Sequence, residues 1–454
     1  MKHSTLKKAI QRTGISQRFG NIFSSDFLYQ LGFFTGFTKR PGQLSTEVFV
    51  DNCLRMVMEE GWGASLSSHC SSLKAHYGVK LHPQSLDERF NEHSEALMRH
   101  LFEQVMNLQL RQSSPMGLLE LFEEIYIEDS TNLELPAVLK TLYKGSGGGA
   151  SQAGLKIDAL YGLRWGTMGI RFHDSCGSDY WQGVPNMPKG SLLLRDLGYF
   201  RLGDFQAVAQ AGSFFLSRLM QHVNVYLDSA GKQELDLLSH LGTMAENETQ
   251  SLKVYLGQKQ LVAARLVIQK VPEAVAEYKR VKLKTDKQNK RKNLSERRLE
   301  LCCANFYITN IPEEMVANSQ IMVLYALRWI IEILFKAWKS VAGLKKKMNQ
   351  MKPHRFMCML YAHMITVLMD TKLVHFFRIE LWNLFGFKIS ELKAFKVLKP
   401  FKNRWWQALR SADAQQIQLA LNDIAETLLR LAGKRKYSTR EKHCDFYIYV
   451  KSQT

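Results

Sequence analysis

One stretch of the chain, residues 319–341, carries the clearest pattern of apolar and polar positions. Its apolar side chains recur at spacings of three and four residues, which is typical of one face of a helix. They are Leu324, Leu327, Ile331, Leu334 and Trp338. Ser319 can cap the start of this helix and Gly343 can end it, so the pattern predicts one helix of about six turns.

Polar side chains lie beside that apolar face. They are Tyr325, Arg328, Glu332 and Lys339. At about 100° per residue they fall within an arc of about 60°, so one carboxylate is flanked by two cations and a phenol. The solvated edge of an amphipathic core helix would account for them equally well, because charged edges are common.

The first quarter of the chain predicts helices. Residues 46–61, 65–78 and 84–108 have helical patterns, and Gly78 can end the second of them. The turn before the third helix is compatible with a DNA-binding helix-turn-helix, although any helical bundle contains such turns. Residues 1–45 hold seven Lys and Arg against a single acid, and predict a DNA-contacting arm or leading helix, with a floppy solvated tail as the alternative.

From residue 118 the pattern changes to short β-branched and aromatic runs. Residues 125–127 predict a strand that ends at Asp129, and residues 191–195 predict a strand that ends at Asp196. The other expected elements are a hairpin at 156–163 and 165–172, a helix at 203–212, and strands at 213–219 and 222–227. This order, with acids at two strand ends, predicts an RNase H-like α/β core.

The spacing Tyr-x2-Arg-x3-Glu-x6-Lys in residues 325–339 resembles, at every position, the signature of DDE transposases of the insertion sequence 4 family. The resemblance covers most of residues 118–345. It implies that the cations and the phenol of this signature hold DNA phosphates near the scissile bond. Arg328 can bind a phosphate bidentately, Lys339 acts as a point charge, and Tyr325 donates one hydrogen bond.

The resemblance also assigns the acids. Asp129, in "DST", and Asp196, in "RDLGYF", match the first and second catalytic aspartates of the family, and Glu332 matches the third acid. Three oxygen ligands without Cys or His partners select Mg²⁺ or Mn²⁺. Two such ions, about 3.5–4 Å apart, can clamp the attacking and leaving oxygens of an in-line phosphoryl transfer.

A gap of 136 residues separates Asp196 from Glu332, which is too long for a single loop and predicts an inserted domain at 226–317. Within it, residues 279–298 hold ten Lys and Arg against two acids. The expected DNA contacts of this stretch are Lys287, Lys290, Arg291 and Lys292. A phosphate-gripping element and a solvated charged hairpin both fit this charge density, and the resemblance favours DNA contact.

The strand that leads into the 319–341 stretch departs from the family. Relatives that open the transposon end through a DNA hairpin carry a tryptophan four or five residues before the strand threonine, and that tryptophan stacks on a flipped base. Here the threonine is Thr309, and neither Asn305 nor Ala304 can stack. Phe306 or Tyr307 can substitute, but only one of them can face the DNA because neighbouring side chains alternate. The alternative is a route without a stable hairpin.

The last hundred residues predict helices at 356–370, 392–410 and 414–431. The second combines six Lys and Arg with aromatic residues and no acid. The aromatic residues are Phe395, Phe401, Trp405 and Trp406. Contact with a DNA backbone plus base stacking fits this composition, and so does an amphipathic helix that buries its aromatics.

Charge and cysteine usage narrow the class of protein. The formal net charge of +19 favours a polyanionic partner, nucleic acid before membrane, with a merely basic soluble protein as the alternative. The longest apolar run, 356–369, contains His363 and is too short to span a bilayer. Seven cysteines without regular spacing or a CxxC pair are typical of reduced cytosolic thiols rather than a zinc site, and the start of the chain lacks a secretory signal.

These features together predict an α/β protein with an RNase H-like catalytic core and an inserted β-rich domain, flanked by helical N- and C-terminal domains. The expected segments are 1–112, helical and DNA-binding; 113–225, the first part of the core; 226–317, the basic insert; 318–345, the core helix; and 346–454, the helical C-terminal domain.

The expected function is Mg²⁺-dependent DNA transposition, an enzymatic activity in which transposon ends are cut and their 3′-OH groups joined to target DNA. The resemblance implies terminal inverted repeats and target DNA as partners, a homodimer on DNA, and a bacterial cytoplasmic location at the nucleoid. A catalytically silent DNA-binding relative and a sequence-nonspecific RNase H-like nuclease are the alternatives.

Overall fold

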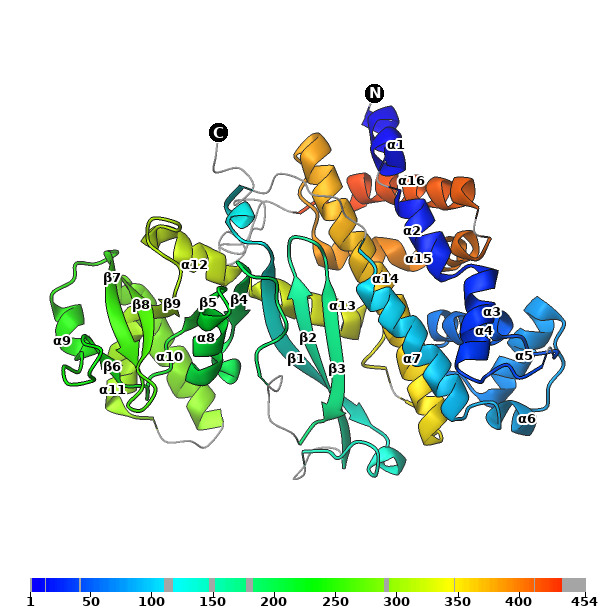
Figure 1. The fold of residues 1–454 in the computed structure, drawn as a ribbon, viewed down its shortest axis with the longest axis horizontal. Coiled ribbons are helices and arrows are strands. Elements are labelled where there is room, and N and C mark those ends of the chain that lie inside the picture. Colours follow the sequence, from blue (N-terminus) through cyan, green and yellow to red (C-terminus); the bar gives the residue numbers. More distant parts are fainter. Residues whose placement is uncertain are drawn as a thin grey trace. The chain divides into compact units, whose positions relative to one another are not determined.

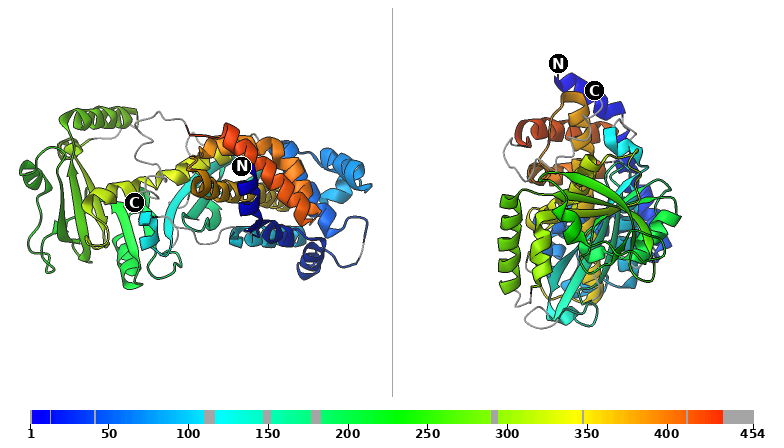
Figure 2. Two further views of the ribbon diagram at one scale, coloured as in Figure 1. Left: turned by 90° about the horizontal axis from the view of Figure 1, so that it is seen from above. Right: turned by 90° about the vertical axis from the view of Figure 1, so that its left-hand side faces the viewer.

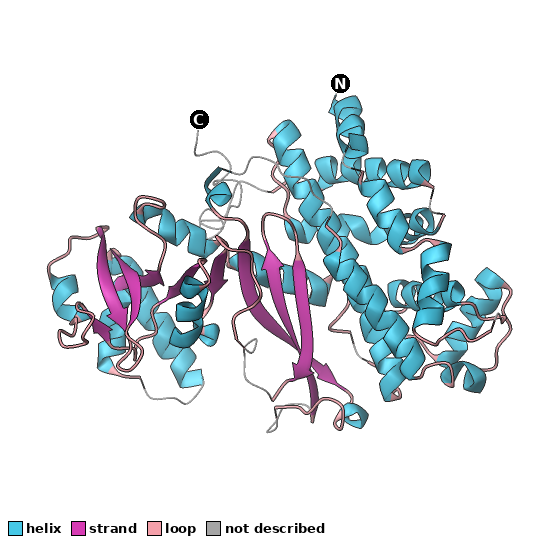
Figure 3. Cartoon of the chain, viewed as in Figure 1, coloured by secondary structure: helices cyan, strands magenta, loops and turns pink. Residues whose placement is uncertain are grey.

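Two units make up the chain in the computed structural model. The helical unit comprises Met1–Ser114, Ser130–Ser178 and Ile331–Tyr437, and the strand-rich unit comprises Pro115–Asp129, Asp179–Ile330 and Ser438–Thr454. The structure describes residues 2–12, 14–40, 42–109, 117–146, 152–176, 183–289, 294–346, 348–411 and 413–434. Figure 3 distinguishes their helices from their strands.

The described strands form a nine-stranded mixed sheet in the order β3-β2-β1-β4-β5-β9-β8-β7-β6. Their bounds are β1 Ile125–Leu135, β2 Ala153–Gly162, β3 Met168–Asp174, β4 Leu192–Arg195, β5 Phe214–Arg218, β6 Val225–Tyr226, β7 Thr249–Leu256, β8 Val262–Lys270 and β9 Ala304–Thr309. Strands β1, β4 and β5 run parallel, whereas the pairs β2–β3, β5–β9, β6–β7, β7–β8 and β8–β9 are antiparallel. The α/β prediction is confirmed, and the order fits an RNase H-like core.

Strand β1 differs from the sequence-based expectation. It begins at Ile125 as predicted, but it continues to Leu135, so Asp129 lies within the strand and not at its end. Its first residues pair with β4, with Glu128 opposite Arg195. The predicted strand was too short because Thr131 is the one β-branched residue among the six that follow Asp129 in the strand, and none of the six is aromatic.

The described residues between β5 and β9 form antiparallel strands and three α-helices. These helices are α9 Leu237–Gly242, α10 Glu273–Asn289 and α11 Glu296–Glu300. Strand β9 pairs with β5 on one side and β8 on the other, with Thr309 opposite both Leu216 and Arg265.

The basic stretch at 279–298 is helical over its described first part, because that part lies in α10. The hairpin interpretation is wrong there. Lys287 lies in α10, while Lys290, Arg291 and Lys292 lie outside the described residues.

Helices form most of the helical unit (Figure 1). Its N-terminal helices are α1 Lys2–Arg12, α2 Ile15–Ile22, α3 Ser25–Phe34, α4 Thr46–Glu59, α5 Leu66–Tyr77, α6 Pro83–Asp87 and α7 Glu92–Asn107. Ile10 and Phe19 are fully buried, so the floppy-tail alternative for the first residues is wrong. The helix predicted at 84–108 is two helices, because the side chain of Asn91 accepts backbone hydrogen bonds from His93 and Ser94 and so starts a new one.

The central helix of this unit is α14 Pro353–Phe385, which is longer than the expected 356–370. It lies alongside α7 in both Figure 1 and Figure 2 and also contacts α4. Among the described residues it alone has the length and hydropathy of a membrane span, but that apolar window is completely buried inside the chain. Burial against other helices identifies it as a core helix.

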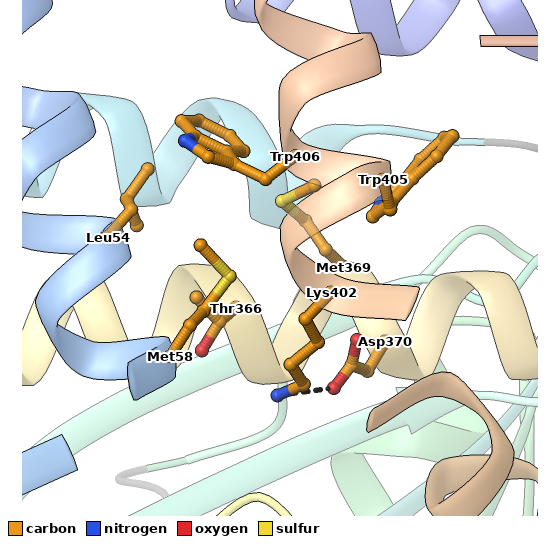
Figure 4. Close-up of a pocket in the computed structure, with 8 residues that line it drawn as sticks. All are labelled: Leu54, Met58, Thr366, Met369, Asp370, Lys402, Trp405 and Trp406. Carbon is orange, nitrogen blue, oxygen red and sulfur yellow. Dashed lines mark ion pairs between the residues drawn. The ribbon is translucent and has the colours of Figure 1, made fainter. Parts of the chain in front are cut away.

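The aromatic residues of α15 Glu391–Arg410 decide between the two interpretations of that stretch. Trp405 and Trp406 are buried, and both line a small cavity of about 20 Å³, which is room for about one water. Figure 4 shows the ion pair that closes this cavity, with Lys402 Nζ 2.9 Å from Asp370 Oδ2. The amphipathic interpretation is confirmed for these two tryptophans, and base stacking by them is wrong. The last helix, α16, spans Ala414–Leu431, as predicted.

A buried lysine ends helix α7. Lys372 Nζ, on α14, donates hydrogen bonds to the backbone carbonyls of Met106 at 3.0 Å and Leu108 at 2.6 Å. Burial lowers the pKa of Lys372 to about 7. In the unfolded chain the pKa is about 10.4, so the folded chain binds fewer protons between these values.

This shift predicts a pH-dependent stability. The free energy of unfolding should rise with pH between about 7 and 10, because the unfolded state holds the proton more tightly. The advantage of wild type over Lys372→Met should grow by about 1–2 kcal/mol from pH 7 to pH 8.5, measured by denaturant unfolding. An advantage that is constant or falls over this range would contradict the assignment.

Candidate active site

The two predicted catalytic aspartates lie at neighbouring parallel strands, Asp129 within β1 and Asp196 directly after β4. Asp129 follows Glu128 on β1, and Asp196 follows Arg195 at the end of β4. Glu128 and Arg195 are register partners on parallel strands, so the next residues along the chain, Asp129 and Asp196, lie side by side. Their side chains remain partly open to solvent, with 21% of Asp129 and 43% of Asp196 exposed.

One guanidinium lies between these two carboxylates. Arg328 Nη1 is 3.9 Å from Asp129 Oδ2, and Arg328 Nε is 3.9 Å from Asp196 Oδ1. These are ion-pair distances, longer than the hydrogen bonds of about 2.7–3.2 Å that nitrogen donors make. The sequence-based prediction that Arg328 belongs to the site of these two aspartates is supported by this geometry.

The phenol of Tyr325 belongs to the same cluster. Its hydroxyl donates to Asp196 Oδ1 at 3.4 Å, and the Arg328 guanidinium lies 5.9 Å from the centre of its ring. Burial, followed by the negative charge of Asp196, raises the pKa of Tyr325 above its usual value. The phenol is therefore protonated at neutral pH and acts as a donor.

The helix that carries these residues is broken, contrary to prediction. In place of one helix there are α12 Asn318–Ala326 and α13 Trp329–Ser340. Leu327, Arg328 and Ile330 each donate their backbone N–H to the carbonyl three residues earlier. This tighter turn separates the two helices and falls at Arg328 itself. Gly343, with a φ of +85°, lies in the turn after α13, as expected for a helix end.

The strand before α12 contributes a second aromatic ring. Tyr307 is buried, and its ring centre lies 5.3 Å from that of Tyr325. Phe306, its neighbour on β9, is half-buried. Tyr307 is thus the ring of this pair that adjoins the Asp196 cluster, and its use as a base-stacking platform stays a hypothesis.

A buried ion-pair network that the sequence did not reveal supports the two aspartates. Arg195 is fully buried, and its Nε donates to Glu128 Oε2 and its Nη1 to Asp204 Oδ2, both at 2.6 Å. Asp204 lies on α8 Leu202–Gln210. The only sequence signal was an arginine and a glutamate at strand positions that otherwise hold buried aliphatic residues.

The remaining predicted residues belong to other parts of the chain. Glu332, in the first turn of α13, and Lys339, in its last turn, are both half-buried and fall in the helical unit. Burial and the nearby Lys345 lower the pKa of Lys339. The roles of Glu332 and Lys339 stay predictions.

Two histidines outside this cluster, His173 and His69, have structural partners. His173 Nε2 lies 2.7 Å from Asp158 Oδ2, so its carboxylate partner is Asp158 and not the adjacent Asp174. His69 is buried beside Asn52, and burial lowers its pKa to about 3. Within the described residues no set of three His, Cys, Asp or Glu side chains converges closely enough to hold a metal ion.

The donor set nevertheless fits a divalent cation. The carboxylates of Asp129 and Asp196 both lie near the guanidinium of Arg328, and neither Cys nor His takes part in the contacts described. Oxygen-only donors of this kind suit Mg²⁺ or Mn²⁺ rather than zinc or copper.

Comparison with known proteins identifies the family of the chain. The family model described as "Transposase DDE domain" matches residues 120–369. The chain belongs to the transposase DDE domain family. The resemblance carried by the Tyr-Arg-Glu-Lys spacing is thereby confirmed, and the family implies use of a divalent metal.

Curated relatives extend the likeness beyond the catalytic domain. The chain is 28% identical over 439 residues to the transposase for insertion sequence element IS231F of Bacillus thuringiensis subsp. israelensis, covering 92% of this chain and 91% of the relative. It is 28% identical over 389 residues to the transposase for insertion sequence element IS1151 of Clostridium perfringens, covering 79% of this chain and 80% of the relative.

The buried network predicts a large loss of stability on breaking it. Arg195→Met should lower the free energy of unfolding by about 3–5 kcal/mol, because it leaves the carboxylates of Glu128 and Asp204 buried without their cation. Denaturant unfolding measures the effect.

Arg280 provides the matched control. It pairs with Glu273 and Glu277, whose side chains are more than half exposed. Arg280→Met should leave the unfolding midpoint almost unchanged. Equal effects of the two substitutions would show that the Arg195 network is energetically unimportant.

Proposed function

We propose that this chain cuts the ends of an insertion sequence and joins their 3′-OH groups to target DNA by metal-dependent phosphoryl transfer. The observation that carries the proposal is that Asp129, within β1, and Asp196, directly after the neighbouring parallel strand β4, both lie 3.9 Å from the guanidinium of Arg328. The family to which the chain belongs supports the reaction class.

The proposed metal ligands are Asp129, Asp196 and Glu332. Asp129 suits a bridging position because it lies within β1, between β2 and β4 in the sheet. Two Mg²⁺ or Mn²⁺ ions would supply an activated water for strand cleavage and stabilise charge on the attacking and leaving oxygens. The three carboxylates would hold the ions, while the cationic and phenolic side chains of the signature would fix the position of the scissile phosphate.

The proposed phosphate contacts surround the carboxylates. Arg328 suits a bidentate contact, because its planar guanidinium presents parallel N–H donors to two phosphate oxygens. Tyr325, kept protonated by burial and by Asp196, suits a single hydrogen bond to a phosphate. Lys339 would add a point charge.

The proposed substrate is double-stranded DNA, comprising the terminal inverted repeats and the target. The net charge of +19 supports a nucleic-acid partner. The basic stretch at 279–298 and the helical N-terminal segment would extend the contact beyond the scissile bond. A homodimer that bridges two ends, and a cytoplasmic location at the nucleoid, complete the proposal.

Substituting the acids tests the chemistry. Asp129→Asn, Asp196→Asn and Glu332→Gln should each abolish Mg²⁺-dependent strand cleavage, while binding of terminal-repeat DNA stays within a few-fold of wild type. The reason is that the carboxylates hold metal, whereas basic side chains supply most of the affinity.

Asp174→Asn is the matched control, because Asp174 is an acid on β3, in the helical unit, that is not assigned to the site. It should cleave like wild type. Retained nicking in any of the three site variants would overturn the assignment. A wild-type protein that binds DNA without cleaving it would favour the catalytically silent relative, and cleavage of any duplex without strand transfer would favour the nonspecific nuclease.

Salt dependence tests the basic stretch. DNA binding should weaken by about 10³–10⁵ between 50 and 200 mM salt, as expected for about six to ten phosphate contacts. Neutralising Lys287, Lys290, Arg291 and Lys292 together should flatten the slope of log K against log salt.

The control for this experiment neutralises Lys232, Lys253 and Lys259, which are exposed lysines outside the basic stretch in the same inserted segment. It should leave the slope nearly unchanged. An unaltered slope in the four-residue variant would assign the stretch to solvent.

A further inference from the structure

Arg328 has a second interaction that its role as a phosphate contact does not use. Its guanidinium lies within ion-pair distance of both Asp129 and Asp196, at 3.9 Å from each, and only 12% of its side chain is exposed. The same two carboxylates are the proposed metal ligands. A cation supplied by the chain is thus directed at the oxygens that a divalent ion would bind.

Arg328 approaches Asp129 and Asp196 at ion-pair distance. Neither 3.9 Å approach is short enough for a direct hydrogen bond. Its ring partner Tyr325 also lies beside the site, and the tight turn between α12 and α13 aims the side chain. A phosphate that hydrogen-bonds to the guanidinium at about 2.7–2.9 Å would pair with it more closely than either aspartate does.

We propose that Arg328 competes with divalent metal for Asp129 and Asp196, and that a DNA phosphate relieves this competition by drawing the guanidinium to itself. The inference rests on the proposed function, since it takes these aspartates as metal ligands. It makes metal binding and DNA binding mutually favourable: each removes a charge that opposes the other.

The physical basis is charge at short range. A positive guanidinium beside two carboxylates opposes the arrival of a second cation there, because like charges repel strongly in a partly buried site. A phosphate that pairs bidentately with Arg328 replaces the two carboxylates as the anionic partner of its guanidinium. By linkage, the factor by which DNA tightens metal binding equals the factor by which metal tightens DNA binding.

The first test measures Mn²⁺ binding to the full-length protein without DNA, by electron paramagnetic resonance of the free ion. Arg328→Gln should lower the Kd for Mn²⁺ by about tenfold, because the competing charge is gone. Arg328→Lys, which retains a charge, should lower it less. An unchanged or higher Kd in Arg328→Gln would overturn the proposal.

Arg218→Gln is the matched control. Arg218 is an exposed arginine at the end of β5, close enough to act electrostatically on Tyr325 and Tyr307, yet the structure gives it no ion pair with Asp129 or Asp196 among the described residues. Its Kd for Mn²⁺ should stay within about twofold of wild type. If Arg218→Gln lowered the Kd for Mn²⁺ as much as Arg328→Gln does, the effect would come from net charge alone. That result would overturn the proposed competition. Thermal unfolding of each variant confirms that it is folded.

The second test adds a duplex oligonucleotide taken from the DNA that flanks the gene. In wild type the duplex should lower the Kd for Mn²⁺ by a larger factor than in Arg328→Gln, because only wild type has a competitor to remove. Equal factors in the two proteins would overturn the coupling.

Failure of this inference and failure of the proposed function give different results. If Asp129→Asn and Asp196→Asn bind Mn²⁺ as tightly as wild type, the aspartates are not metal ligands and the proposed function fails. If both lose Mn²⁺ binding while Arg328→Gln does not tighten it, the metal site stands and the role of Arg328 as a competitor is rejected.

Discussion

The buried ion pair between Arg195 and Glu128 is the interaction on which the rest of the candidate site depends. The two residues are register partners on the parallel strands β1 and β4, and each immediately precedes one of the two aspartates. A slip of one residue would turn every side chain of β4 to the opposite face. The ion pair therefore fixes which oxygens meet at the site, and Asp204 ties helix α8 to the same guanidinium.

The buried pair of Arg195 and Glu128 contributes more to the orientation of the strand end than to the net free energy of folding. Desolvation of a buried ion pair consumes much of its Coulombic attraction, and well-packed apolar residues often serve stability equally well. The neighbouring residues Leu192, Leu193 and Leu194 are completely buried and supply the apolar contribution of β4. Apolar residues cannot fix the orientation of the strand end, because their contacts are not directional. The hydrogen bonds that Arg195 donates at 2.6 Å to two separate carboxylates are directional and hold the strand end in one orientation.

Much of this architecture could be predicted from sequence, for identifiable reasons. The hairpin β2–β3, the strand β4 before Asp196 and the final helix α16 have strong local patterns, and each was predicted close to its observed bounds. The continuation of β1 beyond Asp129 was missed, because its polar residues resemble a loop and only sheet pairing makes them a strand. The Glu128–Arg195 pair was missed because no local pattern reveals which charged residues meet across strands.

The break between α12 and α13 was the least predictable feature, and it bears most directly on chemistry. The apolar face of residues 319–341 continues through Leu327 without interruption, so periodicity alone predicts a straight helix. The three backbone hydrogen bonds that span three residues instead of four tighten the chain at Leu327, Arg328 and Ile330. In a 3₁₀ turn a side chain projects at about 120° per residue rather than 100°, so the direction of Arg328 differs from that in a regular helix. The signature spacing thus identifies the residue, while the backbone turn at Arg328 and the approach of its guanidinium to two carboxylates appear only in the structure.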